Sequence, residues 1–515
     1  MIFILYNTML KLSSPLGAET SNIAKYGILA VTLIIVYQTT QVIYNLYFHP
    51  LCNFPGPWHH KVSRLPWAIG HATGTQAFSA HKLHERYGPV VRIGPDHLSF
   101  TDARAFKDIY GHRVGSESTM GEMAKIHMFN NPIRHIPTSI INADREEHSR
   151  FRRALSHGFS DSSIRQQGPI IAKYVDLLLK RLHEECGEGK NKLNIEAWLN
   201  WTAFDLIGDL IFGESFRCLE NIEYHPWIEL VIGSIRAGAL AVAMTYAGLG
   251  EVVQWMAQAS GNAIKRAGEY TNAMLRIRLA MQKERADLFE GLVKRREEWN
   301  IPFEQLASNA TLLVIAGSET TATTLSGAIY LLLTHPKTLE KLKQEVRSMF
   351  SSADEINISS ANKLTYMLAV IHESLRLFPP VTSGLVRQVP PGGEQVAGRF
   401  VAGGMFVEVQ NWAINHSKDN WKDPWVFNPE RFLVSTEEAA KAGNKLDALQ
   451  AFSFGPRNCI GRNLAYAEMR LILARIIYDF ELKLSDESHD WIGRQKAYAL
   501  WDRIPLYIYL TPVKW

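Results

Sequence analysis

The longest uninterrupted hydrophobic stretch of the chain lies near its N-terminus. From Tyr26 to Phe48 most residues are apolar, and no charged residue falls between Lys25 and His49. A helix of that length can cross the hydrocarbon core of a bilayer. The pattern therefore predicts a single transmembrane anchor over residues 26–48, preceded by an N-terminal segment of residues 1–25.

Basic residues favour a cytosolic location for everything after this anchor. Only Lys11 and Lys25 precede it, whereas His59, His60, Lys61 and Arg64 follow it closely, and positive residues gather on the cytosolic side. A cleaved signal peptide is the alternative, but the apolar core is long and no small-residue cleavage site follows it. Residues 49–60 contain several prolines, which stiffen the chain and end helices, and this composition predicts a hinge.

Beyond the hinge, hydrophobic periodicity predicts one large domain over residues 61–515. Its fold class is mainly α with small peripheral β-sheets, because helical spacing is more extensive than strict alternation. The clearest helical patterns are 203–213, 265–285 and 337–349, and the expected strands are Val90–Ile93, Leu98–Thr101, Ile504–Leu510 and part of Val396–Val409. We find no internal repeat and no low-complexity linker.

A second long apolar segment, Phe303–Thr334, predicts a helix of many turns. Its centre has low helix propensity, since Gly317 and a cluster of threonines are poor helix formers. Such a departure is typical of a functional site. Glu319 and Thr320 can hold water and pass protons. A second transmembrane helix is the alternative, and a buried Glu319 makes that interpretation costly.

Composition narrows the classes of function. The chain has 515 residues, 46% of them hydrophobic, and a formal net charge of +4, which is too slight to indicate nucleic-acid binding. Its four cysteines are scattered without a C-x-x-C pair, which argues against a disulfide framework or a zinc site. The sequence contains neither a phosphate-binding loop nor a dinucleotide fingerprint. A redox reaction would therefore need electrons from a partner protein.

The strongest chemical signal is the stretch Phe452–Gly461, which sets Cys459 between two glycines. An amphipathic run begins near Arg462, so a thiolate at Cys459 would lie near a helix N-terminus, where negative charge is stabilised. Gly455 and Gly461 allow the backbone to approach a flat ligand. A buried structural cysteine is the alternative. The stretch matches F-x-x-G-x-R-x-C-x-G in full, and in this it resembles the cytochrome P450 haem-thiolate monooxygenases.

Two further motifs occur in the order typical of that family. Residues 316–321, Ala-Gly-Ser-Glu-Thr-Thr, resemble its A/G-G-x-D/E-T-T helix. Glu373 and Arg376 form an E-x-x-R pair upstream of a P-E-R-F segment that contains Arg431. The resemblance implies that these three charged residues form a buried structural triad that supports the cysteine loop.

The resemblance also assigns the site. It implies haem b, iron protoporphyrin IX, with Cys459 as the axial thiolate ligand to the iron, and proton delivery by Thr320 and Glu319. His148 stands where the family more often has tryptophan, so its role is less secure than that of Arg152. The residues implied to border the haem are Cys459, Arg457, Arg152, His148, Arg387, Gly317, Ala316, Phe452 and Gly461.

In function, the resemblance implies insertion of one oxygen atom from O2 into a lipophilic substrate by hydroxylation or epoxidation. The expected partners are an NADPH-dependent flavoprotein reductase, with cytochrome b5 as a further electron donor, and the expected location is the endoplasmic reticulum membrane. The sequence of residues 44–51 and 108–113 resembles that of filamentous-fungal members that tailor secondary metabolites. The alternatives are a haem-thiolate isomerase or dehydratase that uses no O2, and a non-catalytic haem-binding protein.

The resemblance also indicates which segments line the substrate pocket. They are Met120–Ile140, the helix face at Leu313 and Ala316, Val381–Val386, and Ala499–Leu500. Most of these residues are apolar, which predicts a terpenoid or polyketide intermediate, with terpenoid ahead. Four basic residues of the first segment are candidates for contact with a polar end of the substrate: Lys125, His127, Arg134 and His135.

Overall fold

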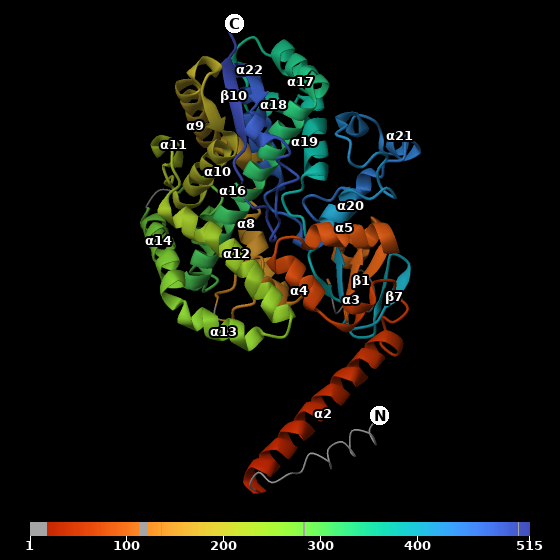
Figure 1. The fold of residues 1–515 in the computed structure, drawn as a ribbon. Helices are drawn as coiled ribbons and strands as arrows, with labels where there is room; N and C mark the ends of the chain where they lie inside the picture. Colours follow the sequence, from red (N-terminus) through yellow and green to blue (C-terminus); the bar gives the residue numbers. More distant parts are fainter. Residues whose placement is uncertain (1–17, 113–121, 135, 282–283, 503) are drawn as a thin grey trace.

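A mainly helical body and one long projecting helix make up the chain (Figure 1). The computed structural model describes residues 18–112, 122–134, 136–281, 284–502 and 504–515. The predicted N-terminal segment up to residue 17, and the predicted pocket residues Met120 and His135, lie outside the described residues.

The projecting helix is α2 (Ala18–Tyr47), which contains the predicted anchor. Its part from Lys25 to Tyr47 has a mean hydropathy of 1.5, and its most apolar stretch has no buried residue. A helix of this length and composition is able to cross a membrane. The helix ends one residue before the predicted limit, and the hinge follows.

Hydrogen bonds fix the hinge to the body. The guanidinium of Arg92 donates to the carbonyl oxygens of Asn45 at 2.8 Å and Leu51 at 3.3 Å, and its backbone N–H donates to Pro55 at 2.7 Å. Arg92 is fully buried, so these bonds satisfy a cation that would otherwise be unpaired in the interior. The anchor therefore leaves the body at a fixed point.

The helices occur throughout the sequence. In the first half they are α3 (Trp58–Val62), α4 (Leu65–Ala72), α5 (Gln76–Tyr87), α6 (Arg104–Tyr110), α7 (His127–Asn130), α8 (Arg145–Leu155), α9 (Asp161–Glu185), α10 (Ile195–Phe212), α11 (Cys218–Asn221), α12 (Pro226–Tyr246) and α13 (Gly250–Ala259). In the second half they are α14 (Gly261–Ala280), α15 (Glu290–Arg295), α16 (Phe303–Thr334), α17 (Pro336–Met349), α18 (Ile358–Ala361), α19 (Thr365–Leu377), α20 (Asn411–Asn415), α21 (Thr436–Lys441) and α22 (Arg462–Asp479).

Three small sheets lie at the periphery. The largest has the order β1-β2-β8-β5-β3, a second has the order β4-β10-β9, and β6 pairs with β7. Among the strand pairs of the described residues, only β2–β8 is parallel. The strands are β1 (Val90–Gly94), β2 (His97–Phe100), β3 (Ala124–Lys125), β4 (Lys192–Asn194), β5 (Arg387–Gln388), β6 (Glu394–Val396), β7 (Arg399–Val401), β8 (Phe406–Val409), β9 (Phe480–Leu484) and β10 (Tyr507–Pro512). The predicted fold class is confirmed.

The core lies where α16 packs against α10, α14, α19 and α22. Every residue of α10 is buried, and so are most side chains along α16. This burial within the protein excludes the interpretation of Phe303–Thr334 as a second transmembrane helix. It also explains why the whole segment is apolar: α16 is surrounded by other helices instead of having one solvated face.

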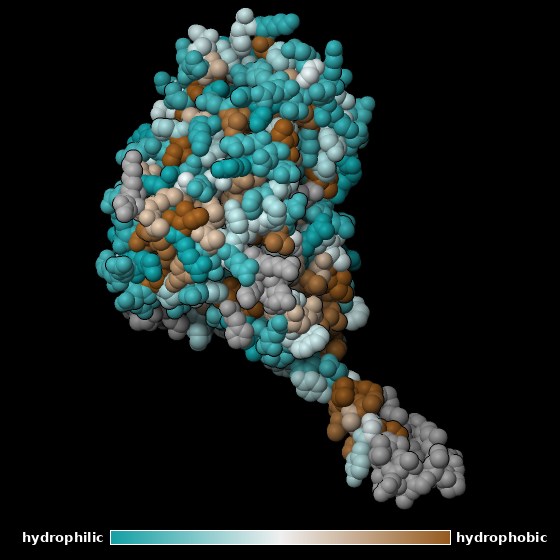
Figure 2. All heavy atoms as spheres, turned by 90° about the vertical axis from the view of Figure 1, so that its left-hand side faces the viewer, coloured by the Kyte–Doolittle hydropathy of each residue, from teal (hydrophilic) through white to brown (hydrophobic). Residues whose placement is uncertain are grey.

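Exposed hydrophobic side chains gather at the end of the body from which α2 leaves. Trp58 and Ile69 are 68% and 61% exposed on α3 and α4, and Trp255 is 69% exposed on α13. All three helices lie at the α2 end in Figure 1, whereas the opposite end is mainly hydrophilic in Figure 2. Apolar patches of this kind mark contact with a membrane or a partner.

Removing residues 1–48 should release most of the protein from membranes and leave its cofactor spectrum intact. The most apolar stretch of the anchor has no residue buried against the body, and the hinge keeps its bond from Arg92 to Leu51. Some attachment should survive through Trp58, Ile69 and Trp255. The measurement is the share of protein in the membrane pellet, with the full chain as reference. A truncated protein that fails to take up its cofactor would show that α2 belongs to the folding unit.

Candidate active site

The cysteine loop joins a short 3-10 turn, Gly455–Arg457, to the N-terminus of α22. The backbone N–H of Cys459 donates to the carbonyl oxygen of Phe452 at 2.8 Å, which closes the loop. Gly455 has a φ of +74°, and a Cβ there would lie 1.9 Å from the carbonyl oxygen of Tyr110. Only glycine fits both the conformation and this close approach. The loop is therefore held firmly against the end of α6.

The sulfur of Cys459 faces an internal cleft, because its side chain is accessible although protein surrounds it. Burial raises the pKa of this thiol, while the N–H of Gly461 and the cations of Arg152 and Arg462 act in the opposite direction. A Cβ on Gly461 would lie 3.8 Å from the sulfur. The loop therefore presents one sulfur, supported by an N–H donor and two cations, to whatever occupies the cleft. A metal ion bound there would take the place of the proton.

One face of α16 is also accessible within the body. Ala316 is exposed, and Thr320 and Thr323 are partly exposed, whereas Ser318 and Thr321 between them are buried. Positions three and four residues apart share a helix face, so this face borders open space. The hydroxyl of Thr320 donates to the carbonyl oxygen of Ala316 at 2.7 Å. Glu319, in contrast, is buried.

Helix packing explains why residue 317 is a glycine. A Cβ on Gly317 would lie 2.9 Å from the side chain of Ile207 on α10. The missing Cβ points toward α10, so this packing accounts for the glycine. Contact between the Gly317 backbone and a cofactor stays a prediction.

Basic side chains gather in a buried cluster with too few acids to balance them. Lys125 on β3 pairs in register with Arg387 on β5, and Arg457 forms an ion pair with Glu122. Burial, followed by Arg387 and Arg457, lowers the pKa of Lys125 to about 7. Burial also lowers the pKa of Arg387, and Arg457 adds to that effect. Three cations against one carboxylate leave room for additional negative charge.

Lys125, a candidate for contact with a polar end of the substrate, lies in this cation cluster. Its ammonium group donates to the carbonyl oxygen of Ile141. The pairing with Arg387 joins segments far apart in sequence, so no local pattern announces it. A lysine in a region expected to be an apolar lining was the one available signal.

His148 and Arg152 lie on consecutive turns of α8, as the sequence predicts. His148 is buried, and its pKa falls to about 3 because of burial and then of Arg457, Lys125, Arg152 and Arg387, so the imidazole is neutral. Arg152 donates to the backbone carbonyl of Asn458 and, at 2.6 Å, to the side-chain oxygen of the same residue. Arg152 therefore supports the cysteine loop directly.

Glu373, Arg376 and Arg431 meet in the interior. Both carboxylate oxygens of Glu373 accept from Arg376 at 2.8 Å, and one also accepts from Arg431 at 3.1 Å. Arg376 also donates to the backbone carbonyl oxygens of Asn415 and Pro424. Glu373 and Arg376 are completely buried. The triad ties α19 to the segment that leads into the cysteine loop.

Comparison with known proteins identifies the family. The sequence profile described as Cytochrome P450 matches residues 55–505. The chain belongs to the cytochrome P450 family. It is 46% identical over 493 residues to the cytochrome P450 monooxygenase tpeC of Talaromyces stipitatus, covering 96% of each chain. It is 41% identical to the trichothecene C-15 hydroxylase of Fusarium sporotrichioides, covering 93% of this chain and 96% of that one.

A third relative points in the same direction. The averantin hydroxylase of Dothistroma septosporum is 40% identical, covering 93% of this chain and 90% of the relative. Monooxygenases and hydroxylases thus match this cytochrome P450 over nearly its full length. The protein is a cytochrome P450 monooxygenase that uses haem with a cysteine thiolate ligand.

The residues present fit that cofactor. Cys459 supplies an accessible sulfur, and the surplus of cations at Lys125, Arg387 and Arg457 suits the two carboxylates of a haem. Basic side chains stabilise such buried carboxylates by charge-assisted hydrogen bonds. Lys125, which lies beside Arg387 and Arg457, is a further candidate for contact with these carboxylates.

Proposed function

We propose that this cytochrome P450 hydroxylates a lipophilic, mostly hydrocarbon intermediate of fungal secondary metabolism, with a terpenoid ahead of a polyketide. The observation that supports this most directly is the accessible face of α16 at Ala316, with Leu313 one turn before it. Residues 381–386 and 498–501, which include further segments expected to line the pocket, carry no fixed charge. Apolar pockets with few polar groups favour hydrocarbon ligands.

Hydroxylation is favoured over epoxidation by the relatives. Two of them are named as hydroxylases, one of a trichothecene at C-15 and one of averantin. We extend the reaction type to this chain, and the substrate itself is a separate question.

The chain's own residues have distinct parts in this reaction. Bound haem supplies oxygen activation, in which a thiolate ligand favours O–O cleavage. Cys459 would hold the iron, and the N–H of Gly461 with the cations of Arg152 and Arg462 would keep the thiolate charged. Lys125, Arg387 and Arg457 would hold the propionates. The hydroxyl of Thr320 accepts and passes a proton, because it can exchange its bond to Ala316 for one to water.

Electrons come from an NADPH-dependent flavoprotein reductase, with cytochrome b5 as a further donor, because the sequence has no dinucleotide motif of its own. A hollow of about 390 Å³ beside Pro456 of the cysteine loop is lined by Arg145, Arg152 and Arg153. A basic surface there suits an acidic docking face.

With α2 as anchor, we place the enzyme in the endoplasmic reticulum membrane with its body in the cytosol.

Microsomes that contain the enzyme and a reductase should convert a lipophilic intermediate only when NADPH is present. With isotopically labelled O2, the product should carry one labelled oxygen atom. A product without label would support the isomerase or dehydratase instead. Turnover of charged, water-soluble compounds alone would contradict the substrate class and leave the oxygen chemistry standing.

Replacing Thr320 with alanine should keep the haem but uncouple turnover, so that NADPH is consumed and peroxide is released. The hydroxyl of Thr320 lies on this accessible face and is able to pass protons, and losing general acid catalysis typically costs about 10²–10⁴-fold. The measurement is product formed per NADPH consumed. Thr334→Ala is the matched control, because Thr334 makes the same kind of bond, to Tyr330 at 3.0 Å, at the far end of α16. Equal coupling in both variants would refute the role of Thr320.

A further inference from the structure

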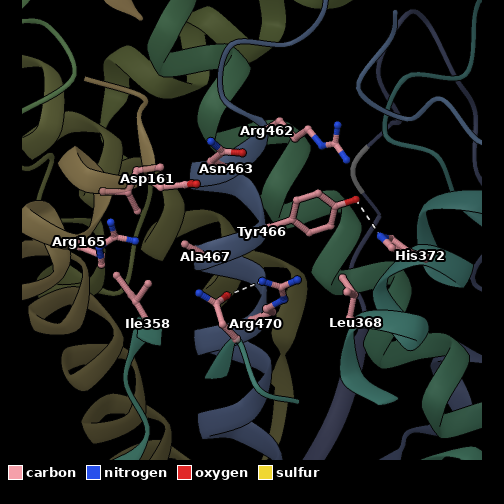
Figure 3. Close-up of a pocket in the computed structure, with 12 residues that line it drawn as sticks. Asp161, Arg165, Ile358, Leu368, His372, Arg462, Asn463, Tyr466, Ala467 and Arg470 are labelled. Atoms are coloured by element: carbon pink, nitrogen blue, oxygen red, sulfur yellow. Dashed lines mark hydrogen bonds between the residues drawn. The ribbon is translucent and has the colours of Figure 1, made fainter. Parts of the chain in front are cut away.

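A second pocket lies between α9, α18, α19 and α22, with a volume of about 400 Å³. Figure 3 shows α22 in the middle of this pocket, with α9 on one side and α19 on the other. Part of its lining is apolar and includes Ile358, Leu368 and Ala467. Such a volume lies within the range of small-molecule sites.

The charge of this pocket is unbalanced. Arg165, Arg462 and Arg470 line it, and Asp161 is the single acidic residue among the lining residues. Over the described part of the chain, none of the three arginines forms an ion pair. His372 also lines the pocket, but burial lowers its pKa to about 4, so it is neutral at pH 7. Three arginines against one aspartate leave two positive charges.

Two of the arginines are already held in place. Arg470 donates to the side-chain oxygen of Asn362, and its guanidinium lies 5.4 Å above the ring of Tyr466. The Nε atom of Arg470 is buried without a hydrogen-bond partner within the described residues. Arg462 lies 5.9 Å above the same ring. Donors fixed in advance cost less entropy when an acceptor binds.

We propose that this pocket binds a small phosphate-bearing ligand. A phosphate monoester carries a charge of about −1.5 to −2 at pH 7, which matches the surplus of two positive charges. Arginine guanidinium groups recognise phosphate oxygens through paired hydrogen bonds. The apolar part of the lining would contact the organic part of the ligand.

The position of the pocket indicates where the ligand comes from. The four helices that form it lie at the end of the body away from α2 (Figure 1). A lipid headgroup in the membrane that holds the anchor is therefore out of reach. The ligand is a water-soluble phosphate compound.

The pocket is connected to the cysteine loop. The ring of Tyr466 lies 5.0 Å from that of Phe452, and the hydroxyl of Tyr466 lies 3.0 Å from Nε2 of His372. Phe452 in turn accepts the hydrogen bond from the backbone of Cys459. A ligand that draws Arg462 or Arg470 away from Tyr466 would change the surroundings of the thiolate.

The test uses the purified haem-loaded enzyme and phenyl phosphate as the probe, at constant ionic strength, with phenol for comparison. Calorimetry should show saturable binding at one site for phenyl phosphate, and the haem absorption band should shift along the same curve. Arg165→Gln and Arg470→Gln should each weaken binding by about tenfold or more, since each removes a charged hydrogen-bond donor.

Lys180→Gln is the matched control, because Lys180 is an exposed cation on the same helix as Arg165 but does not line the pocket. It should leave binding unchanged. Equally weakened binding of phenyl phosphate in Lys180→Gln would mean general charge attraction. Unchanged binding in both Arg165→Gln and Arg470→Gln would mean that the ligand binds elsewhere. Either result, or the absence of saturable binding, overturns the proposal. Arg165 is exposed, so Arg165→Gln tests the site even if Arg470→Gln fails to fold.

Discussion

Replacing Cys459 with alanine should abolish activity and remove the thiolate signature from the spectrum of the CO-bound ferrous protein. The cysteine loop brings one sulfur to the internal cleft, and the closing bond from Cys459 to Phe452 uses the backbone, so the substitution leaves the loop intact. We therefore expect a folded protein that has lost the iron ligand. Absorbance of the reduced, CO-treated protein is the measurement.

Cys52→Ala is the control for this variant. Cys52 lies in the hinge as a free, partly exposed thiol, and its loss should leave the spectrum unchanged. A Cys459→Ala protein that keeps the thiolate spectrum would show that another cysteine binds the iron.

Replacing Glu373 or Arg376 with alanine should leave little or no haem-loaded protein. Each substitution strands a charged partner in the interior, where breaking a buried ion pair costs about 3–5 kcal/mol. That is a large share of the ~5–15 kcal/mol that stabilises a typical domain. Haem content per protein and the melting temperature are the measurements, and both should fall.

Glu437→Ala is the matched control, because Glu437 forms a similar ion pair, with Lys441 at 2.8 Å, on the surface of α21. Exposed pairs contribute little, so haem content should match that of the unaltered protein. Normal haem content in Glu373→Ala would refute the structural role of the triad.

Local signals in the sequence predicted much of the fold. Pro302 and Pro336 border Phe303–Thr334, and the helix has the predicted limits. The two strands around residues 94–97 also lie within a residue or two of their predicted positions. Periodicity and proline act over a few residues, and therefore the sequence alone reveals them.

What the sequence could not show depends on contacts between distant segments. The pairing of Lys125 with Arg387 requires the register of β3 and β5, which are separated by most of the helical body. The packing of Gly317 against Ile207 requires the position of α10. No sequence pattern indicated that Trp255 of α13 is exposed, since an apolar residue in a helix usually indicates the core.

The free projection of α2 from the body has a consequence for kinetics. As the proposed membrane anchor, α2 would keep the enzyme at the bilayer, where the proposed lipophilic substrate partitions out of water. Turnover then follows the amount of substrate per unit of lipid, and the total concentration in the assay is a poor guide to it. Adding inert vesicles should dilute the substrate within the membrane phase and raise the apparent KM, whereas the enzyme without residues 1–48 should respond differently.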